Sequence, residues 1–395
     1  MMQGLTVITN IHPGREGTFP AAIQRAGASI PFDRVTSLHY AAFVVLPSVA
    51  GFPARLVLET NYDGDLCEHL TELIQHGAAG FDDLYQSCAG YPVRGAREDP
   101  EGVRGYFKSN SVPATAFFVA LPGRTRDDIC NAIKVYEEAR NFLDRPPPLD
   151  QLSRDKVWQR LVDHFREPAV LKPQHSPVTQ TSLKWRIARN VLIGFVPGVI
   201  FALFVPLLLV IARIQERREA ARPVPPRRYQ TDPAVTYEYL NLGRQNHMCT
   251  FATVKCGWFR AFMIRLGLFV ANTLANNVFL LGKLDTITTI HSARWILIDS
   301  GKHVVFLADY DGSWSSYIDD FSDPPHLNAV WGNTERFPST WFMLWEGAFN
   351  VQTFEDHVVE EFQPTYFFYR PYGDHSVQNI LRYLEFRDAL ARSLG

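Results

Sequence analysis

The sequence predicts an α+β protein made of two copies of one βαββαβ module, with a membrane segment between them. Three observations support this prediction. A strand pattern that ends in Tyr-Asp-Gly occurs twice, as "ARLVLETNYDGDL" at 54–66 and "KHVVFLADYDGSW" at 302–314. Around both copies, alternating apolar residues indicate strands, and apolar residues three or four positions apart indicate helices. Between the copies, residues 191–212 carry no charge.

Aligning Tyr62 with Tyr310 extends the repeat in both directions. The alignment places "HYAAFVVLP" at 39–47 beside "HSARWILID" at 291–299, so each copy contains two successive strands. It also places an apolar helical face after the shared turn in each copy. Two copies of one module generally pair with each other, so we expect the two halves to dock together.

The C-terminal copy shows the order of elements more clearly. A strand at 290–298 leads through a Ser-Gly turn into a strand at 303–309. We then expect a helix at 313–321, short strands at 327–331 and 340–346, a helix at 351–362 and a last strand at 365–371. Without the first strand, this order is βαββαβ, which is the ferredoxin-like split motif.

The N-terminal copy repeats this order with longer helices. We expect a strand at 56–61, helices at 65–76 and 81–88, a strand at 114–121, and helices at 125–143 and 153–165. The connecting stretch at 91–110 is charged and rich in glycine, which is typical of a loop.

The uncharged segment at 191–212 is long enough to cross a bilayer. At about 1.5 Å per residue it forms roughly 33 Å of helix, which matches the hydrocarbon core. Pro197 and Pro206 favour kinks, and basic residues flank both ends, so the positive-inside rule gives no single orientation. The alternative is a buried core helix of a soluble domain.

A second segment, at 261–282, has an amphipathic pattern. Arg265, Asn272, Asn276 and Lys283 form one polar stripe beneath a wide apolar arc. Such a helix lies in the membrane surface or crosses the membrane beside the first segment. The alternative is a helix buried in the C-terminal domain.

These segments divide the chain into five parts. We expect an N-terminal module at 1–180, a membrane segment with basic flanks at 184–220, a linker at 221–257, the amphipathic helix at 258–285 and a C-terminal module at 286–395. Because modules that pair cannot lie on opposite sides of a bilayer, both are expected on the cytoplasmic side. The basic run after the membrane segment is expected to bind anionic lipid headgroups through Arg213, Arg217, Arg218 and Arg222, the alternative being a solvated linker.

Two ferredoxin-like modules in tandem resemble the dimeric α+β barrel superfamily. That superfamily includes chlorite dismutases, coproheme decarboxylases and dye-decolourising peroxidases, which are haem enzymes, and also haem-degrading monooxygenases and proteins without a cofactor. The resemblance implies an intramolecular barrel formed by the two modules. Neither copy of the repeated phrase supplies the first glycine of the Gly-x-x-Asp-Gly motif of dye-decolourising peroxidases, so no residue role is carried over from that family.

Asp63, Asp311 and Arg294 are the candidate catalytic residues. An aspartate beside a tyrosine at the end of a strand could transfer protons, although Asp-Gly before a helix is also ordinary turn chemistry. Arg294 shares a strand face with Ile296, so it is expected to be a partly buried cation that needs a carboxylate or an anionic ligand.

His69 and His357 are the candidate haem ligands. Each borders the apolar face of an expected helix and could face a barrel interior. The alternative is a histidine that is hydrogen-bonded at the helix boundary. His39 and His291 begin equivalent strands, where capping or hydrogen bonding is expected.

These observations lead to two functional hypotheses. The first is a membrane-attached protein whose barrel cavity binds haem or a lipophilic ligand, and which acts as an oxidoreductase on lipid-derived or peroxide substrates. The second is a non-catalytic membrane adaptor that recruits a partner enzyme. Nucleic acid is not an expected partner, because 39 Lys and Arg against 41 Asp and Glu leave a formal charge of -2.

Overall fold

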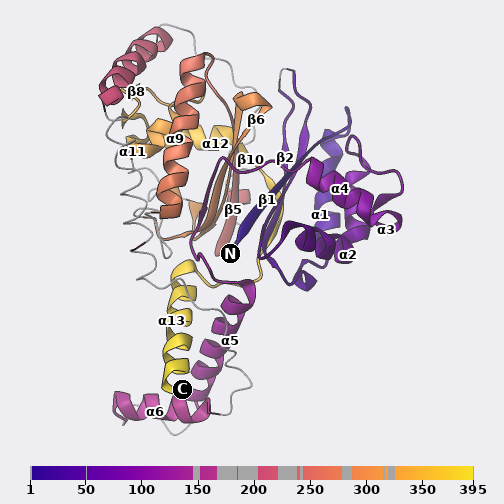
Figure 1. Cartoon of the computed structure of the whole chain (residues 1–395), viewed down its shortest axis with the longest axis vertical. Helices are drawn as coiled ribbons and strands as arrows, with labels where there is room; N and C mark the ends of the chain where they lie inside the picture. Colours follow the sequence, from indigo (N-terminus) through magenta and orange to yellow (C-terminus); the bar gives the residue numbers. More distant parts are fainter. Residues whose placement is uncertain are drawn as a thin grey trace.

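Apart from one two-stranded hairpin, the strands in the described part of the chain form two antiparallel sheets that face each other, with the helices outside them (Figure 1). The computed structural model describes residues 2–49, 51–145, 152–166, 185, 203–220, 238–240, 243–277, 287–314, 316–318 and 325–394. The first sheet has the order β1 (Gln3–Asn10), β3 (Arg55–Tyr62), β2 (Leu38–Leu46) and β11 (Thr365–Tyr369). The second has the order β10 (Phe362–Gln363), β5 (Gln245–Thr253), β7 (His303–Asp311), β6 (Ile290–Ile298) and β4 (Ala116–Val119).

The two halves of the chain exchange strands. β4 belongs to the N-terminal half but pairs with β6, and β11 belongs to the C-terminal half but pairs with β2. Just before β4, the chain still bonds to β1, since Val112 N donates to Thr6 O over 2.8 Å. Just before β11, β10 pairs with β5 of its own half. At each crossing, the chain therefore bonds to the sheet of its own half first and to the opposite sheet afterwards.

Helices cover the outer face of each sheet. The first sheet carries α1 (Phe19–Ser29), α2 (Leu66–Tyr85), α3 (Gly95–Glu98) and α4 (Pro100–Ser109), and the second carries α9 (Trp258–Asn277), α11 (Pro325–Trp331) and α12 (Val351–Glu361). The short strands β8 (Thr340–Trp341) and β9 (Trp345–Glu346) form a hairpin beside these helices.

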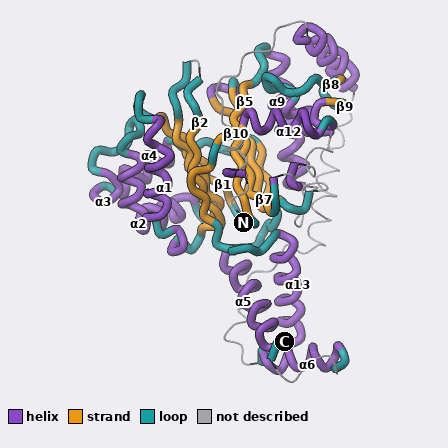
Figure 2. The backbone as a smooth tube through the Cα atoms, turned by 180° about the vertical axis from the view of Figure 1, so that it is seen from behind, coloured by secondary structure: helices purple, strands orange, loops and turns teal. Residues whose placement is uncertain are grey.

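Three helices project from one end of the sheets (Figures 1 and 2). α5 (Arg126–Leu143) follows β4 and α13 (Val377–Leu394) follows β11, and the two pack together through the rings of Tyr136 and Tyr383, whose centroids are 4.0 Å apart. α6 (Arg154–His164) crosses their far end.

The layer between the sheets is apolar at one end. Alternate residues of the strands point inward, and they form a cluster with no exposed member: Val44, Leu46, Val49, Val57, Cys249, Phe251, Ile296, Ile298, Val305 and Leu307. The opposite residues of the same strands point to the helices, so each sheet is buried on both faces.

The predicted fold class is correct in being α+β, but the intramolecular barrel is wrong. Apart from the β8–β9 hairpin, the described strands form two separate sheets, and no barrel closes. The reason is the short length of the crossing strands, since β4 has four residues and β11 has five. Such short strands cannot carry a continuous ladder from one sheet to the other.

The predicted inserted membrane helix is also not supported. Within the described ranges, no helix combines the length and the hydropathy that a membrane crossing needs. Residues 191–202 of the predicted segment lie outside those ranges. Residues 203–220 form a helix that packs against α9 and the β8–β9 hairpin through Ala212, Phe259 and Met343.

The second predicted membrane-associated segment is a helix of the C-terminal half. α9 packs on β4 and α11, and its Ile264 and Leu268 belong to the main core of that half. It connects β5, which lies within the expected linker at 221–257, to β6. We did not predict the order β5, α9, β6, β7, because β5 contains polar residues that interrupt the apolar alternation of a strand.

Other elements were predicted with mixed success. The strands at 56–61, 290–298, 303–309 and 365–371 and the helix at 351–362 are confirmed within one to two residues at most ends. The strand expected at 327–331 is wrong, because these residues lie in α11. β1 and α1 were not predicted.

Candidate metal centre

The layer between the sheets becomes polar at the end near α5 and α13. The inward positions of β3 change from Val57 to Glu59 and Asn61, and those of β7 change from Leu307 to Asp309. These polar side chains are buried, with at most 2% of their surface exposed. A buried polar group is costly unless it is paired, so this end must be a network of mutual contacts.

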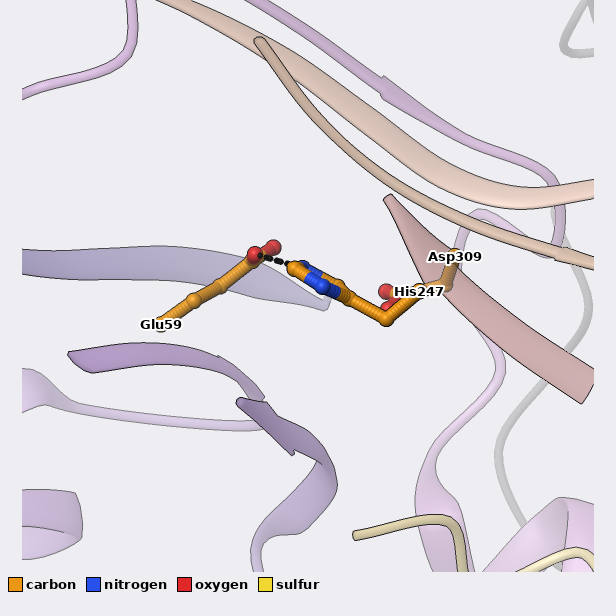
Figure 3. Close-up of side chains that lie close together, drawn as sticks. All are labelled: Glu59, His247 and Asp309. Atoms are coloured by element: carbon orange, nitrogen blue, oxygen red, sulfur yellow. Dashed lines mark hydrogen bonds and ion pairs between the residues drawn. The ribbon is translucent and has the colours of Figure 1, made fainter. Parts of the chain in front are cut away.

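Three potential metal ligands converge in this network (Figure 3). Glu59 of β3, His247 of β5 and Asp309 of β7 each offer one ligand atom, and these atoms all lie within 4.8 Å of one another. β3 belongs to the first sheet, whereas β5 and β7 belong to the second. The group exists only because the two sheets face each other.

His247 is held at both ring nitrogens. Its Nε2 lies 2.7 Å from Oε2 of Glu59, and its Nδ1 lies 2.7 Å from Oγ1 of Thr365 on β11. A threonine hydroxyl can donate or accept, so Thr365 supports either tautomer of the ring. An imidazole held in this way by an outer contact is the usual arrangement of a metal-ligating histidine.

Asp309 has one bonded oxygen and one free oxygen. Its Oδ2 accepts hydrogen bonds from Asn61 Nδ2 and Ser292 Oγ, each over 2.7 Å. Its Oδ1 is buried and has no hydrogen-bond partner among the described residues. Burial, followed by the charge of Glu59, raises the pKa of Asp309 to about 6. A nearby cation would relieve both effects.

Arg294 supplies the positive charge of the network. Its guanidinium lies 3.1 Å from Oε1 of Glu59, donates to Leu5 O and Thr6 Oγ1, and is also hydrogen-bonded to Oδ1 of Asn61. Burial acts to raise the pKa of Glu59, but the opposing effects of Arg294 and His247 leave that pKa lowered. Arg294 was expected to need a carboxylate or an anionic ligand, and the structure places it beside the carboxylate of Glu59.

The two copies of the repeated phrase contact each other at this centre. The alignment of Tyr62 with Tyr310 places Asn61 on Asp309, and these two equivalent side chains are hydrogen-bonded to each other. The two halves are therefore packed about an approximate two-fold relation, with one amide and one carboxylate at the contact.

The predicted catalytic residues Asp63 and Asp311 lie outside the three-ligand group. Oδ2 of Asp63 lies 2.8 Å from His39 Nε2 and accepts the backbone N–H of Arg126, where α5 begins. Asp311 repeats this arrangement with His291 Nε2 at 2.7 Å and the backbone N–H of Val377, where α13 begins.

Each of these histidines also contacts a tyrosine. His291 Nδ1 lies 2.9 Å from the hydroxyl of Tyr40, and His39 Nδ1 is hydrogen-bonded to the hydroxyl of Tyr372. The result is two Asp–His–Tyr chains at the start of the projecting helices. Burial raises the pKa of both tyrosines well above the usual value, so they remain protonated hydrogen-bond donors.

The surroundings of His69 and His357 do not suit haem. Ser37 Oγ and Thr60 Oγ1 contact the two ring nitrogens of His69, and the ring of Tyr62 stacks on its face with the centroids 4.2 Å apart, so protein groups already surround this imidazole where a haem would have to lie. His357 lines a small cavity with Phe306 and Trp331 that has room for about one water molecule. Burial lowers the pKa of both histidines to about 3.

The predicted headgroup-binding arginines have different surroundings. Arg213 pairs with Glu216 over 3.1 Å and lies over the ring of Trp341. Arg217 and Arg218 are exposed on the same helix. Arg222 lies outside the described residues.

Sequence reasoning missed Glu59, His247 and Asp309 as a group. A signal was present for two of them, because Glu59 and Asp309 place a charge at an inward position of an otherwise apolar strand. His247 lies in a stretch that we expected to be a linker, and its contact with Glu59 spans 188 residues. Comparisons with protein-family models, with curated protein sequences and with solved structures found no match to this chain.

Proposed function

We propose that the protein binds a divalent first-row metal ion, such as Zn²⁺, Mn²⁺ or Fe²⁺, through Glu59, His247 and Asp309. The observation that carries this proposal is the convergence of three buried ligand atoms within 4.8 Å from strands of both sheets. One imidazole and two carboxylates suit these cations better than Ca²⁺ or Mg²⁺, which favour oxygen ligands alone.

The charges of the network favour a cation. Glu59 and Asp309 can contribute two negative charges, whereas the guanidinium of Arg294, which contacts Glu59, contributes one positive charge. With Asp309 ionised and His247 neutral, a divalent ion would compensate the remaining negative charge. It would also give Oδ1 of Asp309 the partner that it lacks among the described residues.

The metal would connect the two sheets. Its ligands come from β3 on one side and from β5 and β7 on the other. A bound ion stabilises the state that binds it, so we propose a structural role in locking the two halves together. The oxidoreductase and adaptor hypotheses and the superfamily relation remain predictions that this proposal does not need.

Metal titration tests the proposal. Zn²⁺ or Co²⁺ is added to metal-free protein while binding is followed by calorimetry, by thermal unfolding and, for Co²⁺, by visible absorption. We expect one high-affinity ion per chain and a higher unfolding temperature. Asp309→Asn keeps the side-chain shape and an oxygen for Ser292, and should abolish the high-affinity binding.

Asp311→Asn is the matched control, because Asp311 is a buried aspartate on the same strand outside the group. This variant should bind metal as the unaltered chain does. The proposal is overturned if the unaltered chain binds no stoichiometric ion, or if Asp309→Asn binds the ion equally well.

A further inference from the structure

Exposed large apolar side chains gather on three neighbouring elements of the C-terminal half. Among the described residues, all but Val93 and Trp185 lie on the helix at 203–220, on α9 or at the β8–β9 hairpin and the turn after it. These elements contact one another, since Ala212, Phe259 and Met343 share one apolar cluster. We call them together the apolar end. It lies at the opposite end of the molecule from α6 (Figures 1 and 2).

The helix at 203–220 presents a continuous apolar stripe. Leu203, Leu207, Val210 and Ile214 are exposed and follow one another at steps of four, three and four residues, which places them on one helical face. Leu203, Leu207 and Val210 of this stripe belong to the uncharged run of the sequence at 191–212.

Tryptophans are prominent among the remaining exposed residues. Trp258 at the start of α9 is 76% exposed, and Trp341 and Trp345 of the hairpin are about half exposed. Exposed tryptophans are costly in water but are favoured at the interface between lipid headgroups and acyl chains.

On the helix at 203–220, the acidic side chains face neighbouring elements of the protein and two basic side chains are exposed. Glu216 faces the hairpin, where it accepts hydrogen bonds from Thr340 Oγ1 and from the backbone of Phe342 and Met343. Glu219 faces α9, where it pairs with Arg260. With both glutamates directed inward, Arg217 and Arg218 are the exposed charges on this part of the helix.

We propose that the apolar end docks on the surface of an anionic lipid bilayer. The apolar stripe and the tryptophans would enter the interfacial region, and Arg217 and Arg218 would contact lipid phosphates and carboxylates. An amphipathic surface of this composition binds through buried apolar area together with attraction to anionic lipid. This inference does not depend on the metal centre.

Vesicle flotation of the full chain tests the proposal. The protein should float with vesicles of phosphatidylcholine and phosphatidylserine, and less with phosphatidylcholine alone. L207S/W258S should reduce flotation with both kinds of vesicle at least about tenfold, because it removes two apolar side chains that would be buried in the lipid. R217E/R218E should reduce it about as much on the anionic vesicles only, and high salt should act in the same direction.

Val93→Ser is the matched control, because Val93 is fully exposed but lies near α3 in the other half. It should float normally, and thermal unfolding of each variant confirms that it is folded. Flotation that L207S/W258S leaves unchanged would overturn the proposal. The proposal would also be overturned if the protein did not bind vesicles and formed a dimer that L207S/W258S converts to a monomer. A second copy of the chain would then cover this surface.

Discussion

At the scale of single residues, the polar centre depends on contacts that hold side chains in one orientation. Thr365 is an example, because its hydroxyl is the partner of His247 Nδ1 and comes from a strand of the opposite sheet. Loss of such an outer contact typically weakens metal binding by about 10- to 100-fold.

Thr365→Val should therefore weaken metal binding by about that factor while leaving the metal ligands in place. The measurement is calorimetric titration with Zn²⁺. Thr365→Ser keeps the hydroxyl and should bind close to normally. Equal affinities for the valine and serine variants would show that this contact does not orient His247.

His357 determines part of the response to acid. Burial lowers its pKa to about 3 in the folded protein, against about 6.5 in an unfolded chain. Between these values the unfolded state binds the additional proton, so folding stability decreases as the pH falls below about 6.5. The expected loss from this residue is about 2 kcal/mol between pH 6.5 and pH 5.

His357→Leu should remove that part of the pH dependence. Urea unfolding at pH 7 and pH 5 measures the free energy of unfolding for both proteins. The unaltered chain should lose about 2 kcal/mol more than the variant over this range. Parallel losses in the two proteins would mean that His357 accepts a proton in the folded state.

At the scale of elements, the two Asp–His–Tyr chains connect the sheets to the projecting helices. Asp311 accepts the backbone N–H of Val377 over 2.7 Å and contacts His291 over the same distance. The carboxylate therefore satisfies a donor at the start of α13, where helix N–H groups have no partner within the helix and the dipole favours negative charge.

Asp311→Ala should destabilise the protein by about 1–3 kcal/mol, because it leaves buried donors without their acceptor. Hydrogen exchange should increase in the first turn of α13. Asp374→Ala, which removes an exposed aspartate just before the same helix, is the control and should change little. An undisturbed first turn in Asp311→Ala would contradict the capping role.

At the scale of the whole molecule, the exchange of β4 and β11 makes the halves interdependent. Each sheet is completed by a strand from the other half, and the layer between the sheets contains residues of both. Neither half can bury its inward face alone, so we expect one cooperative unfolding transition.

Cleavage of the connection between the halves tests this expectation. A protease site introduced at 221–233 would divide the chain into two fragments. After cleavage they should elute together on gel filtration and separate only in denaturant. Two fragments that elute separately and remain folded would show that the halves are independent domains.

Sequence reasoning succeeded where a short-range pattern carries the information. The alternation of β6 and β7 and the apolar spacing of α12 were sufficient to locate these elements, and the repeat of Tyr62 at Tyr310 correctly identified two equivalent hairpins. It failed at α9, where an amphipathic pattern does not say whether lipid or a protein core covers the apolar side. It also failed at β5, whose inward His247 breaks the apolar alternation of a strand.

The sequence by itself determined that the chain carries a duplicated β-hairpin with an aspartate at the end of each copy, because consecutive residues give the pattern of a strand and its turn. Only the tertiary structure decided that the equivalent positions Asn61 and Asp309 touch, and that His247 joins Glu59 across 188 residues. The physical reason is that these contacts arise from the packing of two sheets and from the exchange of their edge strands. The packing and the strand exchange bring together residues on inward faces of different strands. No fixed spacing along the chain relates these residues, so a sequence pattern cannot reveal their contact.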